Sequence, residues 1–226
     1  MAASCTDGVE SYRYERKFVV PLVLVRGLPT LLRTSSFGFR EIFAERFVNN
    51  LYFDTPFFKF FNENVQGLSE RKKIRIRWYG DAASLGERRL EVKCKSGLVG
   101  RKHVAILPPS AGSPFGQSRL ERLPLPPEMQ SQLIGMVPTL FNRYLRRYFL
   151  SADERFRATL DYDIAYSPPC PDASFLRYGS RDSNAVLELK YACDLDVEAA
   201  GIASELHFDI SKKSKYVTGI YHVYNS

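Results

Sequence analysis

The chemistry that this sequence lacks narrows its function first. Its four cysteines, Cys5, Cys94, Cys170 and Cys193, form no CxxC pair, which argues against a zinc site or a disulfide framework and favours a reducing compartment. Its three histidines are isolated, with no HxH or HxxxH pair, so none is predicted to be a metal ligand or a base. No serine or cysteine has a nucleophile-elbow setting.

Nucleotide-binding motifs and membrane segments are missing as well. The chain contains no GxxxxGK[ST] P-loop and no GxGxxG, so a nucleotide site at a helix N-terminus has no support. Its N-terminus has no apolar core of signal-peptide length. The longest apolar run, Phe18 to Val25, is interrupted by Pro21 and is too short to span a bilayer. We therefore expect a cytoplasmic protein with no membrane span.

Size and charge set the next limits. The 226 residues fit one domain, and we expect a loose leader over residues 1–10 and a single domain over residues 11–226. The hydrophobic fraction of 45% and the charged fraction of 25% are ordinary for a globular protein. The formal net charge of +7 favours acidic partners: nucleic acid, nucleotides, inorganic phosphates or an anionic membrane.

What the sequence does have is charge at every second position in four stretches, mainly cationic. A period of two indicates a β-strand with one charged and one apolar face. Several such faces turned inward on one sheet would form a basic channel for a polyanion and its metal ion. The stretches are Arg13-Tyr14-Glu15-Arg16-Lys17, Lys73-Ile74-Arg75-Ile76-Arg77, Arg89-Leu90-Glu91-Val92-Lys93-Cys94-Lys95 and Val186-Leu187-Glu188-Leu189-Lys190.

The wider pattern predicts an α+β protein, a closed antiparallel eight-stranded β-barrel with flanking helices, because closure removes the sheet edges. Ile74, Ile76 and Trp78 would point outward under the helices, while Arg75 and Arg77 face the lumen. Loops are expected at 108–127 and 167–184. Strands are expected at about 12–20, 48–53, 72–79, 87–95, 101–107, 141–149, 155–163 and 185–191, and helices at about 22–32, 56–61, 129–136, 196–206 and 211–223.

The strand glutamates Glu15, Glu91 and Glu188 each precede a lysine by two residues. Carboxylates among phosphates suit a hard divalent cation, Mg²⁺ or Mn²⁺. Their other role would be charge balance for the neighbouring lysines. Both roles stay open for Glu188, whereas charge balance is favoured for Glu15 and Glu91.

Eight motifs in order along the chain resemble the polyphosphate polymerase domain of the VTC (vacuolar transporter chaperone) family, a branch of the triphosphate tunnel or CYTH-like superfamily. No single motif is decisive, but their order and spacing cover nearly the whole chain. They are Tyr14-Glu15-Arg16-Lys17-Phe18, Leu51-Tyr52-Phe53-Asp54-Thr55, Ile74-Arg75-Ile76-Arg77-Trp78-Tyr79, Leu90-Glu91-Val92-Lys93, Asn142-Arg143-Tyr144, Arg157-Ala158-Thr159-Leu160-Asp161, Leu187-Glu188-Leu189-Lys190 and Lys212-Lys213-Ser214-Lys215-Tyr216.

This resemblance implies a tunnel that binds triphosphate or polyphosphate with Mn²⁺ or Mg²⁺, and transfer of the γ-phosphoryl group of ATP to a growing phosphate chain. It implies a metal ligand in Glu188. The catalytic residues carried over are Lys17, Arg75, Arg77, Lys93 and Glu188, and the substrate-binding residues are Arg143, Arg157, Lys190, Lys212 and Lys215.

Two departures from the resembled families bear on the reaction. Arg13 stands where the hydrolase members carry a further glutamate, which favours the VTC-type reaction. The chain also lacks the SPX-like sensor and the transmembrane segments of the eukaryotic complex, so we expect a stand-alone domain.

Three alternatives remain at this point. The same tunnel could serve a triphosphatase or polyphosphate hydrolase, or a non-catalytic polyphosphate-binding module. A nucleic-acid binder is disfavoured, because Trp78 alternates with Ile76 on the apolar side and is therefore expected in the core rather than stacked on a base.

Overall fold

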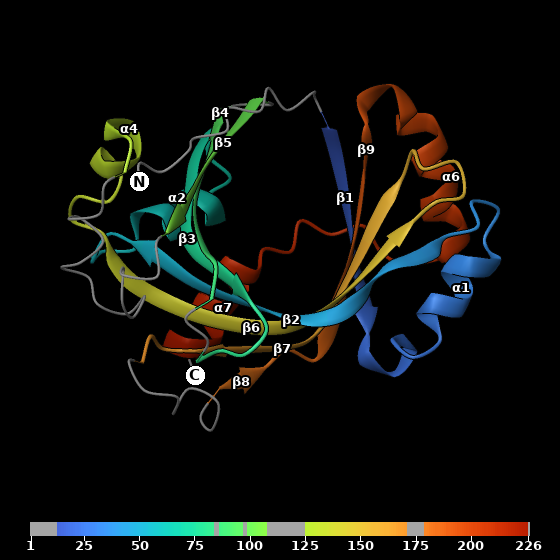
Figure 1. The fold of residues 1–226 in the computed structure, drawn as a ribbon, viewed down its shortest axis with the longest axis horizontal. Helices are drawn as coiled ribbons and strands as arrows, with labels where there is room; N and C mark the ends of the chain where they lie inside the picture. Colours follow the sequence, from blue (N-terminus) through green and yellow to red (C-terminus); the bar gives the residue numbers. More distant parts are fainter. Residues whose placement is uncertain (1–12, 84–85, 97–98, 108–124, 171–178, 226) are drawn as a thin grey trace.

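The computed structural model describes residues 13–83, 86–96, 99–107, 125–170 and 179–225. Its centre is one antiparallel sheet of nine strands in the order β1-β9-β7-β6-β2-β3-β4-β5, with β8 paired to β7. The sheet curls into a U, with β2 and β6 at the base and β1 and β4 on opposite arms (Figure 1). The strands are β1 (Arg13–Pro21), β2 (Arg40–Asp54), β3 (Glu70–Tyr79), β4 (Arg88–Ser96), β5 (Val99–Leu107), β6 (Val137–Leu150), β7 (Arg157–Ser167), β8 (Ser180–Arg181) and β9 (Asn184–Ala192).

Helices cover the outside of both arms of the U (Figure 1). The α-helices are α1 (Leu28–Thr34), α2 (Lys59–Val65), α4 (Pro127–Ser131), α6 (Asp196–Leu206) and α7 (Lys215–Tyr224), and two short 3-10 helices are η1 (Leu22–Leu24) and η3 (Cys193–Leu195).

The strands of the β3 arm bury their apolar positions on the outer face of the U. Ile74, Ile76 and Trp78 are at most 2% exposed and pack with Phe60 of α2 and Met129 of α4. The expected outward direction of these three side chains is confirmed. Because strand side chains alternate, the residues between them, including Arg75 and Arg77, point to the inner face.

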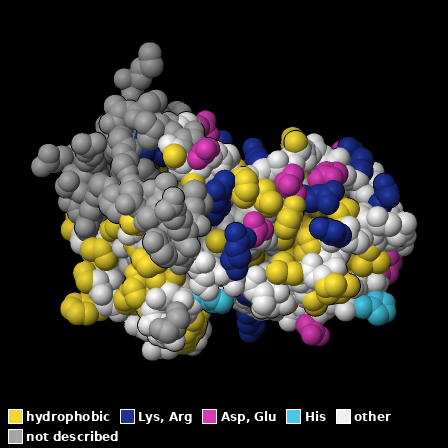
Figure 2. Space-filling view, turned by 90° about the horizontal axis from the view of Figure 1, so that it is seen from below, with side chains coloured by type: hydrophobic (Ala, Val, Ile, Leu, Met, Phe, Trp, Pro, Cys, Tyr) yellow, Lys and Arg dark blue, Asp and Glu magenta, His cyan; other side chains and the backbone are white. Residues whose placement is uncertain are grey.

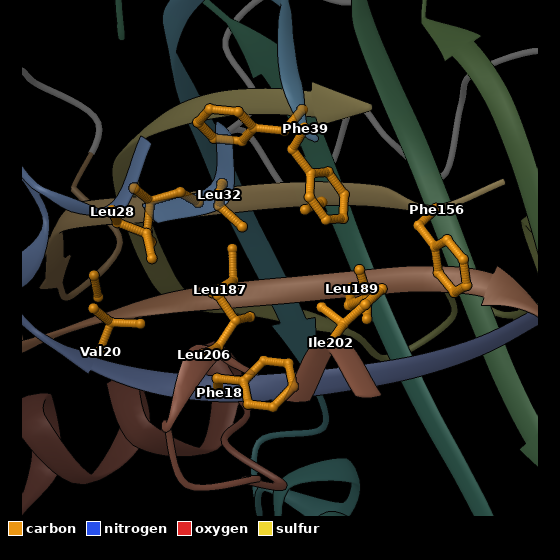
Figure 3. Close-up of a cluster of buried hydrophobic side chains, with 14 of the residues drawn as sticks. Phe18, Val20, Leu28, Leu32, Phe39, Phe156, Leu187, Leu189, Ile202 and Leu206 are labelled. Carbon is orange, nitrogen blue, oxygen red and sulfur yellow. The ribbon is translucent and has the colours of Figure 1, made fainter. Parts of the chain in front are cut away.

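The other arm has an equivalent apolar layer. Phe18 and Val20 of β1 and Leu187 and Leu189 of β9 form one buried cluster with side chains from α1 and α6 (Figure 3). Both outer layers hold the strands by hydrophobic burial, so the inner positions are free to carry charge.

Helix α7 packs on the inner face rather than the outer one. Its residues Tyr216 and Ile220 are buried against Leu140 and Tyr144 of β6. Gly219 lets the helix approach closely, because a Cβ there would lie 2.5 Å from Leu140 Cδ2. This contact brings the N-terminus of α7, with Lys215, to the charged part of the inner face.

The base of the U shows a mixed surface when viewed from below (Figure 2). Basic and acidic side chains are interspersed there with apolar ones, with no single basic patch in this view. Two of the basic side chains outside the inner face have close acidic partners: Arg147 pairs with Glu41 at 2.7 Å, and Arg181 pairs with Asp163.

The expectation of a closed eight-stranded barrel is wrong. The sheet has nine strands, and its edge strands β1 and β5 do not pair with each other. The segment between α6 and α7 explains part of this, because it covers the free edge of β1. Ser211 N donates to Lys17 O at 2.7 Å, Val19 N donates to Asp209 O at 3.4 Å, and Phe18 forms a bridge with Ile210. The backbone groups of Lys17 and Val19 that a closing strand would use are therefore already engaged.

Most predicted elements are present, but several boundaries differ. The strand expected at 48–53 begins at Arg40, and the helix expected at 211–223 begins at Lys215, where the Ser214 side chain caps it. The helix expected at 22–32 is a 3-10 turn followed by α1. The expected leader, most of the loop at 108–127 and the centre of the loop at 167–184 lie outside the described residues.

In the described part of the chain, no helix has both the length and the apolar character that crossing a membrane requires.

Candidate functional site

The charged inner positions of both arms and of α7 form one set of interacting side chains, which we call the inner cluster. Cations outnumber carboxylates in it. The cluster consists of Glu15, Lys17, Lys73, Arg75, Arg77, Glu91, Lys93, Lys102, Arg146, Asp161, Glu188, Lys190 and Lys215, and its contacts are described below.

On the β3 arm, Glu91 holds two cations in place. Arg75 Nε donates to Glu91 Oε2 at 2.7 Å, and Lys102 Nζ lies 3.1 Å from Glu91 Oε1. Burial alone would raise the pKa of Glu91, but Arg75, Arg77 and Lys102 outweigh it and hold that pKa far below its usual range. Glu91 is thus an ionised structural partner whose two oxygens are already engaged.

At the base of the U, buried amides orient Arg77. Arg77 Nε donates to Asn50 Oδ1 at 2.8 Å, and Asn50 Nδ2 donates to Asn142 Oδ1 at 2.8 Å. Arg77 Nη2 lies 3.5 Å from the hydroxyl of Tyr144. The guanidinium is therefore oriented by neutral groups, it forms no ion pair with a described residue, and its nearest electrostatic carboxylate partner is Glu91.

A buried carboxylate binds α7 to the sheet. Asp161 of β7 is 0% exposed and accepts hydrogen bonds from Arg146 Nε at 2.5 Å and Nη2 at 2.7 Å. Its second partner is Lys215 Nζ at 2.6 Å, which also lies over the ring of Tyr144. Burial would raise the pKa of Asp161, but Arg146 and Lys215 lower it, so this carboxylate is ionised.

Glu188 of β9 is a different kind of carboxylate. Its side chain is buried, and its one ion pair among the described residues is with Lys190 Nζ at 2.9 Å, a side chain that is 45% exposed. Burial would raise its pKa, yet Lys190, Lys17, Arg146 and Lys215 together keep that pKa well below the usual range. Glu188 is ionised without being held by an arginine.

The two arms interact electrostatically across the inner face. Lys93 of β4 is influenced by Glu15 and Lys17 of β1 and by Glu188 and Lys190 of β9, and its pKa is lowered, chiefly by burial. Lys17 Nζ lies 2.6 Å from Glu15 Oε1, and its pKa is raised because Glu15 and Glu188 outweigh the effect of burial. The curled sheet therefore brings cations of distant strands into one electrostatic field.

The structure brings most of the predicted site residues together. Lys17, Arg75, Arg77, Lys93, Glu188, Lys190 and Lys215 all belong to the inner cluster. Arg157 lies opposite Lys190 and is exposed, and Lys212 is exposed ahead of α7; neither forms an ion pair with another described residue.

Arg143 is the predicted site residue that points away from the inner face. Its neighbour Tyr144 contacts the inner cations, so Arg143 points to the opposite face of β6. There its guanidinium lies 3.7 Å from the ring centre of Phe47 and is influenced by Asp81 and Asp163. The structure does not bring Arg143 into the inner cluster.

Lys73 and Arg146 are cluster residues that were not predicted as site residues. Arg146 follows Asn142 and Tyr144 at every second position, so the strand period could have selected it in place of Arg143. Lys73 precedes Arg75 and Arg77 with the same period.

A divalent metal ion fits this cluster only if its ligands include phosphate oxygens. No group of three His, Cys, Asp or Glu side chains within the described ranges could hold an ion. Glu188 offers oxygen atoms, and the buried Oγ1 of Thr159, opposite Glu188 on β7, has no hydrogen-bond partner in the described structure. Mg²⁺ is commonly held by one or two carboxylates together with substrate phosphates, which matches this donor set.

Comparison with protein families decides the classification. The VTC domain family matches residues 12–224. The chain belongs to the VTC domain family. Comparison with curated protein sequences gave no match.

Solved structures share the fold of this VTC domain at low sequence identity. A candidate adenylate cyclase from Bacillus halodurans has a TM-score of 0.58 at 15% identity over 90% of this chain and 94% of its own. A Hippeastrum protein, a candidate adenylyl cyclase with a dominant triphosphatase activity, has a TM-score of 0.55 at 17% identity over 90% and 93%. A candidate adenylate cyclase from Vibrio parahaemolyticus has a TM-score of 0.54 at 16% identity over 92% and 98%.

Proposed function

We propose that this VTC domain is a metal-dependent polyphosphate polymerase that transfers the γ-phosphoryl group of ATP to a growing polyphosphate chain. The observation that supports this most is the excess of cations on the inner face, gathered from both arms of a curled sheet. A buried excess of positive charge is unfavourable unless an anion compensates it. A phosphate chain supplies one negative charge after another along its length and would compensate several cations at once.

The proposed roles follow from the contacts. Arg75 and Arg77 are held in fixed orientations, and a planar guanidinium can donate two hydrogen bonds to phosphate oxygens. Lys17 and Lys93 approach from the other arm and from β4, and would neutralise the phosphates between them. Arg157, Lys190 and Lys212 would guide the chain at the margins of the cluster, and Lys215, held by Asp161, would add positive charge within it.

The metal ion of the proposed reaction would be Mg²⁺ or Mn²⁺, held by Glu188 and phosphate oxygens. When bound, such an ion neutralises charge that develops on the transferred phosphoryl group. In the reaction, the bond between the γ-phosphorus and the β–γ bridging oxygen of ATP breaks, and a terminal oxygen of the chain bonds to that phosphorus. ADP leaves with the bridging oxygen. The protein residues orient both reactants and offset their repulsion.

Hydrolysis of triphosphate is the second candidate, with water in place of the chain terminus. The fold relative from Hippeastrum, with its dominant triphosphatase activity, favours it. The two reactions use the same cations and differ in the attacking group.

The deciding experiment incubates the chain with ATP, Mn²⁺ or Mg²⁺ and a short polyphosphate primer, and separates the products on a gel. We expect lengthening phosphate chains and one ADP for each phosphate added, and no product in the presence of a chelator. Free phosphate without longer chains would contradict the polymerase proposal and support the hydrolase proposal. Absence of both products would overturn the enzymatic proposal.

A further inference from the structure

Lys73 differs from the other lysines of the inner cluster because no carboxylate is among the groups that act most strongly on it, whereas Lys93, which also has no ion pair with a described residue, is acted on by Glu15 and Glu188. Lys17, Lys102, Lys190 and Lys215 each have a carboxylate within 3.1 Å. Lys73 forms no ion pair with any described residue; its Nζ donates to the neutral Ser214 Oγ at 3.0 Å.

The charged groups that act most strongly on Lys73 are all cations. Lys17 faces it from β1, Lys93 faces it from the opposite position on β4, and Arg71 and Arg75 flank it on β3. Burial and these four positive charges disfavour a further charge at the same place, and they lower the pKa of Lys73 to about 7. The neutral form of its amine is therefore populated near neutral pH.

Ser214 suits either protonation state of Lys73. Its hydroxyl can accept a hydrogen bond from an ammonium group or donate one to a neutral amine. Ser214 also caps α7, with its side chain accepting from Val217 N. Loss of the Lys73 proton therefore leaves no buried polar group unpaired at the start of the helix.

We propose that Lys73 is a proton-accepting binding residue: the neutral form of its amine is populated while the inner cluster is empty, and this form takes up a proton as phosphate oxygens enter, so anion binding is coupled to proton uptake. This proposal rests on the proposed function, because it needs a phosphate ligand in the same cluster. The amine lone pair forms the new N–H bond with a proton from solvent, and no other bond changes.

The coupling gives a definite sign to the pH dependence. When the pH is below the pKa of Lys73 in the empty site, Lys73 is already protonated, so phosphate binding requires no proton uptake by this residue. Above it, binding must draw a proton from an increasingly basic solution. The contribution of Lys73 to affinity then falls by up to about tenfold per pH unit, until the solution reaches the pKa of the occupied site.

The test measures how many protons are taken up when inorganic triphosphate binds to the wild-type chain and to Lys73→Arg. Calorimetric titrations in buffers of different ionisation enthalpy give this number. Arginine keeps its charge throughout, so protons exchanged by triphosphate itself cancel in the difference. We expect the wild type to take up close to one proton more than the variant at pH 8, and about the same number at pH 6.

Two results would overturn the inference, and they can be told apart. Equal proton counts at both pH values, with triphosphate bound by both proteins, would reject the role of Lys73 and leave the proposed function standing. No triphosphate binding by the wild type would reject the proposed function and the inference with it.

A direct measurement covers the case in which Lys73→Arg does not fold. The pH titration of the Lys73 side chain, followed by NMR in the wild type, should have its midpoint near 7 and move upward by more than one unit with triphosphate. A midpoint near 10.4, the usual value for lysine, would also reject the inference.

Discussion

Replacing Glu188 with glutamine is expected to reduce metal-dependent turnover at least about 100-fold, with little change in the folded state. Loss of a residue that merely supports a metal ligand typically costs 10–100-fold, so loss of the ligand itself should cost more. Glutamine has nearly the same shape and keeps one side-chain oxygen. Among the described residues, Glu188 forms its one ion pair with the half-exposed Lys190, so the change breaks that pair and no arginine pair.

The matched control is Glu205→Gln, the same change on α6, where Glu205 bonds to Ser36 away from the inner cluster. Initial rates across a range of Mn²⁺ concentrations, together with thermal unfolding, would separate metal binding from stability. If Glu188→Gln retains wild-type rates at every metal concentration, Glu188 is not a metal ligand.

Asp161→Asn is expected to have the largest effect on stability, lowering the free energy of unfolding by about 3–5 kcal/mol. The change leaves Arg146 and Lys215 buried beside an uncharged amide. Asp163→Asn, two residues along β7, is the control. Asp163 is half-exposed and pairs with Arg181 at the surface, so its loss should cost less than about 1 kcal/mol. Denaturant unfolding of both variants measures the difference.

The pH dependence of Asp161→Asn has a predicted sign. The pKa of Asp161 is lowered in the folded protein, so its contribution is fully present above the unfolded value of about 3.9. That contribution disappears as the pH falls below this value toward the folded pKa. The difference between wild type and Asp161→Asn should therefore be constant near pH 7 and shrink in acid. A difference that grows in acid, or equal losses in the two asparagine variants, would contradict the account.

The period of two predicted which face of each central strand carries charge, and it did so because helices bury the alternate positions. It placed Arg75 and Lys93 correctly, since their strands are regular. Arg143 is predicted from its motif and not from the period of two. It lies between Asn142 and Tyr144, whose side chains are on the inner face, and the structure places it on the opposite face.

Closure of the sheet could not be predicted in the same way. It depends on whether the edge of β1 meets β5 or another segment, and the segment that covers this edge lies about 190 residues later in the chain. The alternating pattern of a strand does not specify such a partner. The charge pairs that distinguish Glu188 from Glu91 and Asp161 likewise depend on strand register and on the docking of α7.

The central claim is that the cations of the inner face bind a phosphate chain, and the most direct measurement is the affinity for inorganic triphosphate of three proteins: wild type, Arg75→Met and Arg143→Met. Both variants lose an arginine from the sheet, but from opposite faces. We predict that Arg75→Met weakens binding roughly 10- to 150-fold, the equivalent of about 1.5–3 kcal/mol, while Arg143→Met stays within about twofold of wild type. Equal losses in both variants, or a loss only in Arg143→Met, would contradict the claim.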